Sequence, residues 1–441
     1  MTRTHDKAAG TGGPDAHNES EIRTQRFDGK RFDVVIVGAS LAGCATATLL
    51  GRRGVRVALI DKHAGEDSYK RLCGHYIQAS ATPVIERLGL TGPIEAAGGV
   101  RNGADLWTRW GLIASPEPPG QRPYGYSIRR SKLDPMLRRV AIETPGVEYF
   151  PRLEAVRLLG GEHAVTGVEL RDRARRSVHV SARLVVGADG RNSAVARLAG
   201  ARERRVANQR FCYMAYFTGV GLPPGSGGRL WALDPDVAIA APNDDGLTIL
   251  AAFPHKRRLP EFRDGRAETL RELFAALPVP PELAGAELAG KVLGYTDYAI
   301  VVRDATPRPG LALVGDAALT CDPVMAIGCG WALQSAAWLA DSAAPALAGA
   351  EPLAPALRRY QRQRRHHLIP HHRMLAADAR ARTMNPVQRL LFSAAARDPQ
   401  TAALLHRYSE RSIPPRRLLA PRALARAARV SGRASAVRVP R

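Results

Sequence analysis

The feature that most constrains the fold is the segment RFDVVIVGASLAGCATATLLGRRGVRVALID, at residues 31–61. Residues 34–37 are a continuous apolar run, residues 42–50 are helix formers, and residues 55–60 are apolar again. A strand, a glycine turn, a helix and a second strand in this order predict a βαβ unit. Such a parallel strand pair implies a sheet that is covered on both faces, and therefore an α/β protein.

The turn in this unit, GASLAG at residues 38–43, follows the dinucleotide fingerprint G-x-G-x-x-G except that Ser40 replaces the second glycine. In that fingerprint the glycines make the turn, admit a pyrophosphate and let the helix pack on the strand. Asp61 ends the second strand, where its carboxylate is placed to accept hydrogen bonds from ribose hydroxyls. The sequence therefore predicts a dinucleotide at this helix N-terminus. The alternative is an ordinary βα turn followed by a chance acid.

Two later segments extend this interpretation: VVGADGRNSAV at residues 185–195 and ALVGDAALTCDPVMAIGCG at residues 312–330. With the first turn and Asp61, in this order, they resemble the three nucleotide-binding motifs of FAD-dependent enzymes with the para-hydroxybenzoate hydroxylase fold. The resemblance covers about residues 31–350. It implies FAD as the cofactor and NAD(P)H as the reductant.

The resemblance also implies roles for individual residues. The pyrophosphate would lie against Gly38, Ser40 and Gly43, the adenosine ribose against Asp61, and the ribityl chain against Asp316. The implied cofactor-binding residues are Gly38, Ser40, Leu41, Ala42, Gly43, Asp61, Lys62, Arg130, Asp189, Gly190, Asp316, Pro323, Gly328, Cys329 and Gly330.

Other positions in this set have more specific expectations. Arg130 precedes a Leu-Asp helix and would contact the flavin, although a surface charge is the alternative. Asp189 and Gly190 would support both FAD and the passage of NAD(P)H. Residues 328–330 would cradle the flavin ring, with Pro323 stiffening the preceding loop. A helix that begins near Trp331 would offer its positive end to a reduced flavin.

The last motif also departs from the aromatic hydroxylases. Ala332 stands where many of them have Asn, and Leu319 stands where a His often follows Gly-Asp-Ala-Ala. Residues 70–90 and 328–340 instead resemble the geranylgeranyl reductase and halogenase branch. The Trp-x-Trp-x-Ile-Pro signature of flavin halogenases is absent, since residues 106–113 read LWTRWGLI. The missing signature argues against halogenation, which is kept only as an alternative function.

His75 and Tyr76 are the candidate catalytic residues. They lie in LCGHYIQAS, where such folds bring a loop near the flavin, and they would orient a substrate or relay a proton. Structural roles for both are the alternative. Tyr213, Tyr216 and Trp231 would line an apolar pocket or belong to the core.

The five cysteines are widely spread and lack CxxC spacing, which argues against a disulfide framework and against structural zinc. Reduced and inert thiols are expected, including Cys73, Cys321 and Cys329 near the flavin. No metal site is predicted. In HHLIPHH at residues 366–372, Pro370 interrupts the helical spacing and no carboxylate completes a ligand set.

We predict an α/β fold with a discontinuous Rossmann-like FAD-binding domain at residues 31–205 and 304–350. A mixed or antiparallel-sheet substrate domain is expected at residues 206–303. An Arg-rich helical region follows at residues 351–441, and its final 30 residues have little periodicity, which favours disorder. Residues 1–30 lack the apolar core of a secretory signal and are interpreted as a flexible tail of a cytoplasmic protein.

The net charge of +23 comes mostly from the C-terminal region. From residue 356 onward there are 20 Arg and 3 acidic residues. This region has few aromatic residues and no nucleic-acid-binding motif, so no nucleic-acid partner is expected. It allows weak association with a membrane surface. Apolar stretches are shorter than the roughly 20 residues of a transmembrane helix, and the oligomeric state is left open.

The residues and the resemblance together favour a single-component, FAD-dependent, NAD(P)H-consuming monooxygenase. Its substrates would be O2 and a small apolar or aromatic organic molecule, as in hydroxylation or epoxidation during natural-product biosynthesis. The alternatives are an FAD-dependent reductase of prenyl-type alkenes and a flavin-dependent halogenase. A third class is a basic adaptor that binds membrane or nucleic acid through its Arg-rich region.

Overall fold

The computed structural model describes residue 27 and residues 30–63, 65–117, 121–161, 163–222 and 227–435. Most of the tail predicted for residues 1–30 lies outside the described residues. Phe27 is described, and it is buried rather than free. Its ring stacks on Phe150 with a centroid distance of 4.1 Å, because the edge of the first sheet leaves apolar surface there.

The predicted βαβ unit is confirmed, and it forms the centre of a parallel sheet. The unit comprises β1 (Val34–Val37), α2 (Leu41–Gly51) and β2 (Val57–Ile60). In the sheet the strand order is β21 (Leu311–Leu313), β12 (Leu184–Gly187), β1, β2 and β8 (Val147–Phe150). All pairs are parallel, with Val35 between Val185 and Ala58.

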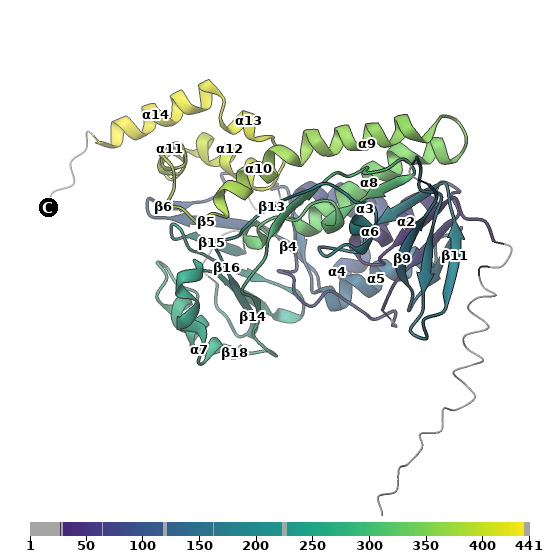
Figure 1. Cartoon of the computed structure of the whole chain (residues 1–441). Coiled ribbons are helices and arrows are strands. Elements are labelled where there is room, and N and C mark those ends of the chain that lie inside the picture. The colour runs from purple at the N-terminus through teal and green to yellow at the C-terminus, as the bar shows by residue number, and fades with distance from the viewer. Residues whose placement is uncertain are drawn as a thin grey trace, which may run out of the picture.

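Both faces of this sheet are covered, as its largely apolar strands require. One face meets α2, α5 (Arg130–Ile142) and α8 (Gly328–Leu347), which share a core with Val34 and Ile36. The other face meets an antiparallel sheet of β9 (Glu154–Leu159), β10 (Gly167–Arg171) and β11 (Ser177–Ser181), together with α6 (Ala194–Leu198). Figure 1 shows these layers around β9, β11, α2 and α8.

A second, largely antiparallel sheet forms the other half of the molecule. Its order is β18 (Glu287–Leu288), β14 (Cys212–Thr218), β17 (Thr248–Phe253), β16 (Val237–Pro242), β15 (Gly228–Ala232), β5 (Ala104–Thr108) and β6 (Gly111–Ile113), with β19 (Leu293–Tyr295) on β14. Residues 243–246 connect β16 and β17 as a hairpin, since these two strands pair around them. Helix α7 (Arg266–Ala275) covers one face with Leu270 and Phe274.

This sheet extends beyond the predicted substrate domain. We expected it within residues 206–303, but β5 pairs in parallel with β15, with Leu106 opposite Leu230, and β6 pairs with β5. Residues 104–113 therefore belong to the second sheet, since a pairing across more than a hundred residues leaves no local sequence signal. The other predicted domain boundaries stay a prediction.

The C-terminal region continues as helices to the end of the described chain. They are α9 (Leu353–His367), α10 (Ile369–Asp378), α11 (Pro386–Ala395), α12 (Pro399–Ser409), α13 (Pro415–Leu418) and α14 (Pro421–Ser435). The prediction that the final 30 residues are disordered was therefore wrong up to Ser435. Residues 436–441 lie outside the described residues. Leu418 on α13 and Ala427 on α14 are buried with Leu391 and Leu405, which gives these helices a core.

Helices α10, α11 and α12 lie near the β5, β6 and β15 end of the second sheet, whereas α9 runs alongside α8 (Figure 1). None of the described helices combines the length and hydropathy needed to cross a bilayer. The remaining elements are short: α3 (Thr82–Leu88), α4 (Thr91–Ala96), a sheet of β3 (Tyr76–Ile77), β7 (Gly125–Ser127) and β4 (Val100–Asn102), and the pair of β13 (Glu203–Val206) with β20 (Ile300–Arg303).

Candidate active site

A cavity of about 580 Å³ lies where the parallel strands end, and we call it the nucleotide cavity. Residues that follow β1, β2, β8, β12 and β21 all line it. In parallel α/β sheets this carboxyl edge is where ligands bind. Every cofactor-binding residue that the sequence predicted lines this cavity, except Gly43 and Gly330.

The glycine turn between β1 and α2 packs too tightly for side chains. Gly38 has a φ of +108°, and a Cβ there would lie 2.5 Å from the carbonyl oxygen of Ala188. A Cβ on Gly43 would lie 1.7 Å from the carbonyl oxygen of Gly38. Gly43 therefore supports the cavity by letting α2 approach the turn, without lining it.

Helix α2 begins without a side-chain cap. Ser40 is its N-cap residue but makes no capping hydrogen bond, and its Oγ accepts instead from Nη2 of Arg130 at 2.7 Å. The first N–H groups of a helix have no partner within the helix, and Leu41 and Ala42 line the nucleotide cavity. An uncapped helix N-terminus facing a cavity fits the pyrophosphate of FAD.

Asp61 lies beside this turn at the end of β2. The N–H of Gly38 donates to the carbonyl of Ile60 at 2.8 Å, which ties the turn to the strand. The Asp61 residue is 6% exposed, and its Oδ1 accepts the N–H of His63 at 3.0 Å. Within the described residues no hydrogen bond engages its Oδ2, which fits the predicted contact with a ribose. Lys62 lines the cavity next to it.

Arg130 reaches the nucleotide cavity as part of a buried ion pair. Its Nε donates to Oδ1 of Asp134 at 2.5 Å and its Nη2 to Oδ2 at 2.9 Å. The two side chains are 3% and 0% exposed. Asp134 also accepts the backbone N–H of Lys70 at 3.0 Å. A buried pair is tolerated only when its remaining donors and acceptors are engaged, so Arg130 is a structural part of this wall.

Arg138, which the sequence interpretation missed, supports the glycine turn. This buried guanidinium donates to the carbonyl of Ala39 from Nη2 at 2.9 Å and to the carbonyl of Ser68 at 2.8 Å. Arg130, Asp134 and Arg138 follow one another at four-residue spacing on α5, and therefore share one helix face. Charged residues at this spacing beside Leu133 and Leu137 were the available signal.

Asp189 and Gly190 follow β12 and line the nucleotide cavity. The Asp189 carboxylate accepts from the Ser193 hydroxyl at 2.5 Å and from the N–H of Val195 at 3.0 Å, so it also fixes the start of α6. Gly190 has a φ of +80°, and a Cβ there would meet no atom within 4 Å. The Asp-Gly pair therefore combines a structural carboxylate with an open stretch of backbone.

The segment after β21 forms a further part of the wall next to α2, since a Cβ on Gly315 would lie 2.9 Å from Cβ of Ala42. Lys70 donates from Nζ to Oδ2 of Asp316 at 2.8 Å, and Asp316 raises the pKa of Lys70. Pro323, Gly328 and Cys329 line the cavity at the start of α8. Gly330 does not line the cavity. A Cβ there would make only an ordinary contact, at 3.5 Å, with Cβ of Ala81.

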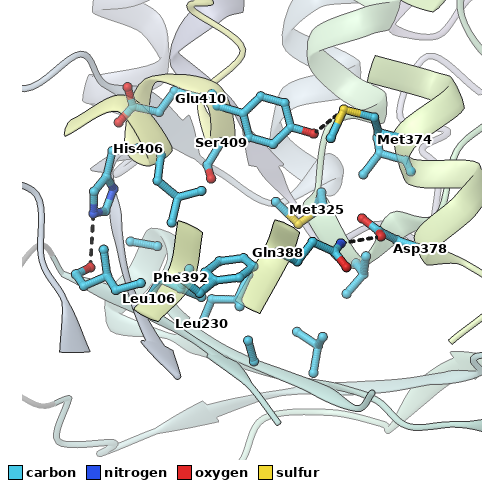
Figure 2. Close-up of a pocket in the computed structure, with 18 of the residues that line it drawn as sticks. Leu106, Leu230, Met325, Met374, Asp378, Gln388, Phe392, His406, Ser409 and Glu410 are labelled. Atoms are coloured by element: carbon cyan, nitrogen blue, oxygen red, sulfur yellow. Dashed lines mark hydrogen bonds between the residues drawn. The ribbon is translucent and has the colours of Figure 1, made fainter. Parts of the chain in front are cut away.

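A second cavity, of about 760 Å³, lies between β5, β15 and β16 and the C-terminal helices, and we call it the apolar cavity. Figure 2 shows Leu106, Leu230, Met325, Met374 and Phe392 around it. Tyr76 and Ala326 line both cavities. The two cavities are therefore adjacent at these two residues, and we call this place the junction.

Gln78 holds this junction together. Its Nε2 donates to the carbonyl of Met325 at 2.8 Å and to the carbonyl of Ser409 at 3.2 Å. The loop before α8 is thereby tied to the end of α12. The sequence interpretation missed Gln78 because its two partners lie 247 and 331 residues away.

Glu410 brings a carboxylate to the apolar cavity (Figure 2). Burial, aided by Glu117, raises the pKa of Glu410 to about 7. Within the described residues no side-chain hydrogen bond or ion pair engages this carboxylate. Glu410 also acts on Tyr76 electrostatically. Burial and the charge of Glu410 raise the pKa of Tyr76, and the Tyr76 hydroxyl therefore stays protonated.

The structure does not bring His75 into the lining of either cavity. His75 is 6% exposed, its Nδ1 shares a hydrogen bond with the Tyr216 hydroxyl, and the two rings stack. Burial lowers its pKa. Its φ of +52° is uncommon for a residue with a side chain and marks a constrained loop. Catalysis by His75 stays a prediction, while Tyr76 lies at the junction.

Comparison with known sequences supports the nucleotide site. The family described as "FAD binding domain" matches residues 31–369. The tryptophan 2-halogenase of Chondromyces crocatus is 27% identical over 369 residues, which is 76% of this chain and 65% of that protein. The digeranylgeranylglycerophospholipid reductase 1 of Methanopyrus kandleri is 27% identical over 359 residues, covering 75% of this chain and 85% of that protein.

Solved structures share the fold at low identity. The flavin-dependent brominase Bmp2 aligns with a TM-score of 0.74 at 18% identity, covering 92% of this chain and 100% of that chain. PqsL of Pseudomonas aeruginosa, described as a probable FAD-dependent monooxygenase, aligns with a TM-score of 0.63 at 22% identity, covering 85% and 99%. The predicted α/β fold and the predicted resemblance are confirmed.

Proposed function

The chain belongs to the family defined by this FAD binding domain, and from this premise we propose that it is an FAD-dependent oxidoreductase that works as a single-component monooxygenase. NAD(P)H is the proposed reductant, and the substrates are O2 and a small, largely apolar or aromatic organic molecule. Bound FAD would supply hydride transfer and oxygen activation. Hydroxylation or epoxidation in natural-product biosynthesis fits such a substrate.

The observation that carries this proposal is the meeting of the two cavities at Tyr76 and Ala326. The nucleotide cavity has an uncapped helix N-terminus and carboxylates for a dinucleotide. The neighbouring cavity offers apolar walls of a size suited to a small organic molecule. A substrate held in the apolar cavity would lie next to the part of the bound FAD that reaches the junction.

Three residues of the apolar cavity have proposed roles toward the substrate. The Tyr76 hydroxyl has no hydrogen-bond partner within the described residues, so it is available to donate to a substrate oxygen or nitrogen. Glu410 would accept a hydrogen bond or a proton from a polar group of the substrate, since its pKa of about 7 lets it exist in both forms. Phe392 and its apolar neighbours would exclude water.

A reductase of prenyl-type alkenes is the second candidate. The relative from Methanopyrus kandleri, a lipid reductase by name, is covered over 85% of its length. An apolar cavity closed by helices also suits an isoprenoid chain. Halogenation is the third candidate. The names of the halogenase relatives favour it, and the missing Trp-x-Trp-x-Ile-Pro signature opposes it.

Oxygen consumption separates these reactions. Purified protein is loaded with FAD and screened against apolar aromatic and prenyl compounds while NAD(P)H oxidation and O2 uptake are recorded. One O2 consumed per NAD(P)H, with label from ¹⁸O2 in the product, supports the monooxygenase. Product formed without oxygen supports the reductase, and product that requires chloride or bromide supports the halogenase. A colourless protein that does not bind FAD overturns all three.

A further inference from the structure

Two cysteines from distant parts of the chain meet at the wall of the nucleotide cavity. Sγ of Cys73 lies 3.5 Å from Sγ of Cys329, and both residues line the cavity. Both are free thiols in the structure. A disulfide has an Sγ–Sγ length of about 2.05 Å, so a movement of roughly 1.5 Å would join them. The expectation of inert thiols treated each cysteine alone and could not anticipate this pair.

The surroundings of the pair favour a thiolate on one sulfur. Nη1 of Arg130 lies 3.8 Å from both sulfurs, and the N–H of His75 donates to Sγ of Cys73 at 3.4 Å. Cys329 is in the first turn of α8, where the helix dipole favours negative charge. The hydrogen bond from Cys329, together with Arg130, holds the pKa of Cys73 well below its usual range.

The pKa of Cys329, the other member of the pair, shifts in the opposite direction. Its hydrogen bond to Cys73, together with burial, raises the pKa of Cys329. A thiolate beside a neutral thiol is the arrangement from which disulfides form and break. The three other cysteines differ, because burial raises the pKa of Cys44, Cys212 and Cys321.

Both cysteines are close in sequence to the two residues that line both cavities. Cys73 is three residues before Tyr76 and Cys329 is three residues after Ala326, and these two residues line both cavities. Arg130 also joins the pair to the glycine turn, since its Nη1 lies 3.8 Å from both sulfurs while its Nη2 donates to Oγ of Ser40. A flavin nucleotide that extends from the glycine turn to the junction would therefore pass these sulfurs.

We propose that Cys73 and Cys329 form a redox-active dithiol that exchanges an electron pair with the flavin bound in the nucleotide cavity. In the oxidative direction the two thiols lose two electrons and two protons and an Sγ–Sγ bond forms. Both electrons and both protons pass to oxidised FAD. The reverse reaction breaks the bond and restores both thiols. The inference rests on the proposed function only through the binding of FAD.

Thiol mapping of the unmodified protein tests bond formation. The protein is oxidised with diamide, denatured, alkylated and digested, and the peptides are identified by mass spectrometry. We expect a linked peptide that joins Cys73 to Cys329, with Cys44, Cys212 and Cys321 alkylated as before oxidation. Alkylation of all five cysteines after oxidation overturns the proposal, and so does a link that involves a different cysteine.

Anaerobic reduction of the FAD-loaded protein tests electron exchange. After oxidation, the wild type should take up about four electrons per FAD, against about two for Cys73→Ser and Cys329→Ser, because each redox couple accepts two. Cys321→Ser, which alters a neighbouring buried cysteine outside the pair, should behave as wild type. Two electrons per FAD in the wild type overturn the exchange. Failure to bind FAD overturns the proposed function as well, whereas a bound flavin without the extra uptake overturns only this inference.

Discussion

Nζ of Lys70 lies 2.8 Å from Oδ2 of Asp316, and this ion pair joins the loop after β2 to the loop after β21. Lys70 is partly exposed, with 44% of its side chain accessible, whereas the Asp316 side chain is 16% accessible. Both residues line the nucleotide cavity. The pair therefore links two loops of the cavity wall and positions the carboxylate proposed for the ribityl chain.

Asp316→Asn should weaken FAD binding by roughly 10- to 100-fold, because a hydrogen bond to a charged group contributes about 1.5–3 kcal/mol. Flavin absorbance that remains with the protein after gel filtration, and a titration of the apoprotein with FAD, measure the effect. Asp341→Asn is the matched control, because Asp341 forms surface ion pairs with Arg53 and Arg87 outside the cavity. Equal FAD affinity in both variants would remove Asp316 from the site.

Arg138→Met should lower the free energy of unfolding by about 2 kcal/mol, because buried carbonyls lose a charged donor. The Ala39 and Ser68 carbonyls would be left without this partner, and the glycine turn would loosen, so FAD affinity should fall as well. Chemical denaturation and FAD titration measure both effects. Arg139→Met, at the exposed next position of α5, should change neither. A loss of stability with unchanged FAD affinity would mean that Arg138 supports the fold alone.

The nucleotide site could be predicted from the sequence because its residues act locally. Gly38, Asp61 and Asp316 each lie at the end of a strand, within a turn whose conformation those few residues dictate. Gly43 was assigned to the cofactor from the same turn motif, although it does not line the cavity and instead lets α2 pack closely on the turn.

The apolar cavity could not be predicted in this way. Its floor needs β5 beside β15, and its roof needs helices from the last part of the chain. Gln78 makes its decisive contact with a carbonyl 331 residues away. The hydrophobic periodicity of a single segment cannot indicate a contact between such distant residues. The final helices were missed because α14 carries arginines such as Arg422 and Arg429 at exposed positions, which obscured the buried Ala427 and the partly buried Leu424.

The free energy of unfolding should depend on pH through the raised pKa of Glu410. Its pKa is about 7 in the folded protein, above the ordinary value of 4.5. Below pH 4.5 the carboxyl is protonated in both states, so it costs nothing. As pH rises toward 7 the unfolded state ionises first, and the folded state loses stability. Glu410→Gln removes this cost, so its melting temperature should exceed that of wild type at pH 8 and match it at pH 4.

Thermal unfolding at both pH values measures this difference. Glu287→Gln, on the exposed strand β18, controls for the loss of a carboxylate elsewhere. If Glu410→Gln shifts the melting temperature equally at pH 4 and pH 8, the carboxylate does not titrate as the structure requires. In the same variant, substrate binding should lose its dependence on pH near 7, since a donor group on the substrate prefers the ionised carboxylate.

Detachment of the last helix should disrupt the apolar cavity while the nucleotide cavity still binds FAD. Ala427 is 0% exposed and packs in the core of the C-terminal helices, so Ala427→Glu would place a carboxylate among apolar side chains and displace α14. Leu418 of the neighbouring α13 and Leu419, which follows it, line the apolar cavity, which should open to solvent. We expect normal FAD content, greater binding of an apolar fluorescent dye, and loss of substrate-dependent NAD(P)H oxidation.

Ala428→Glu is the matched control, because it adds the same charge at the next, exposed position of α14. It should leave dye binding and substrate-dependent turnover unchanged. Loss of FAD from Ala427→Glu alone would show that the C-terminal helices also hold the nucleotide cavity together. Unchanged turnover in Ala427→Glu would mean that the apolar cavity does not hold the substrate, and the proposed site would then have to lie elsewhere around the nucleotide cavity.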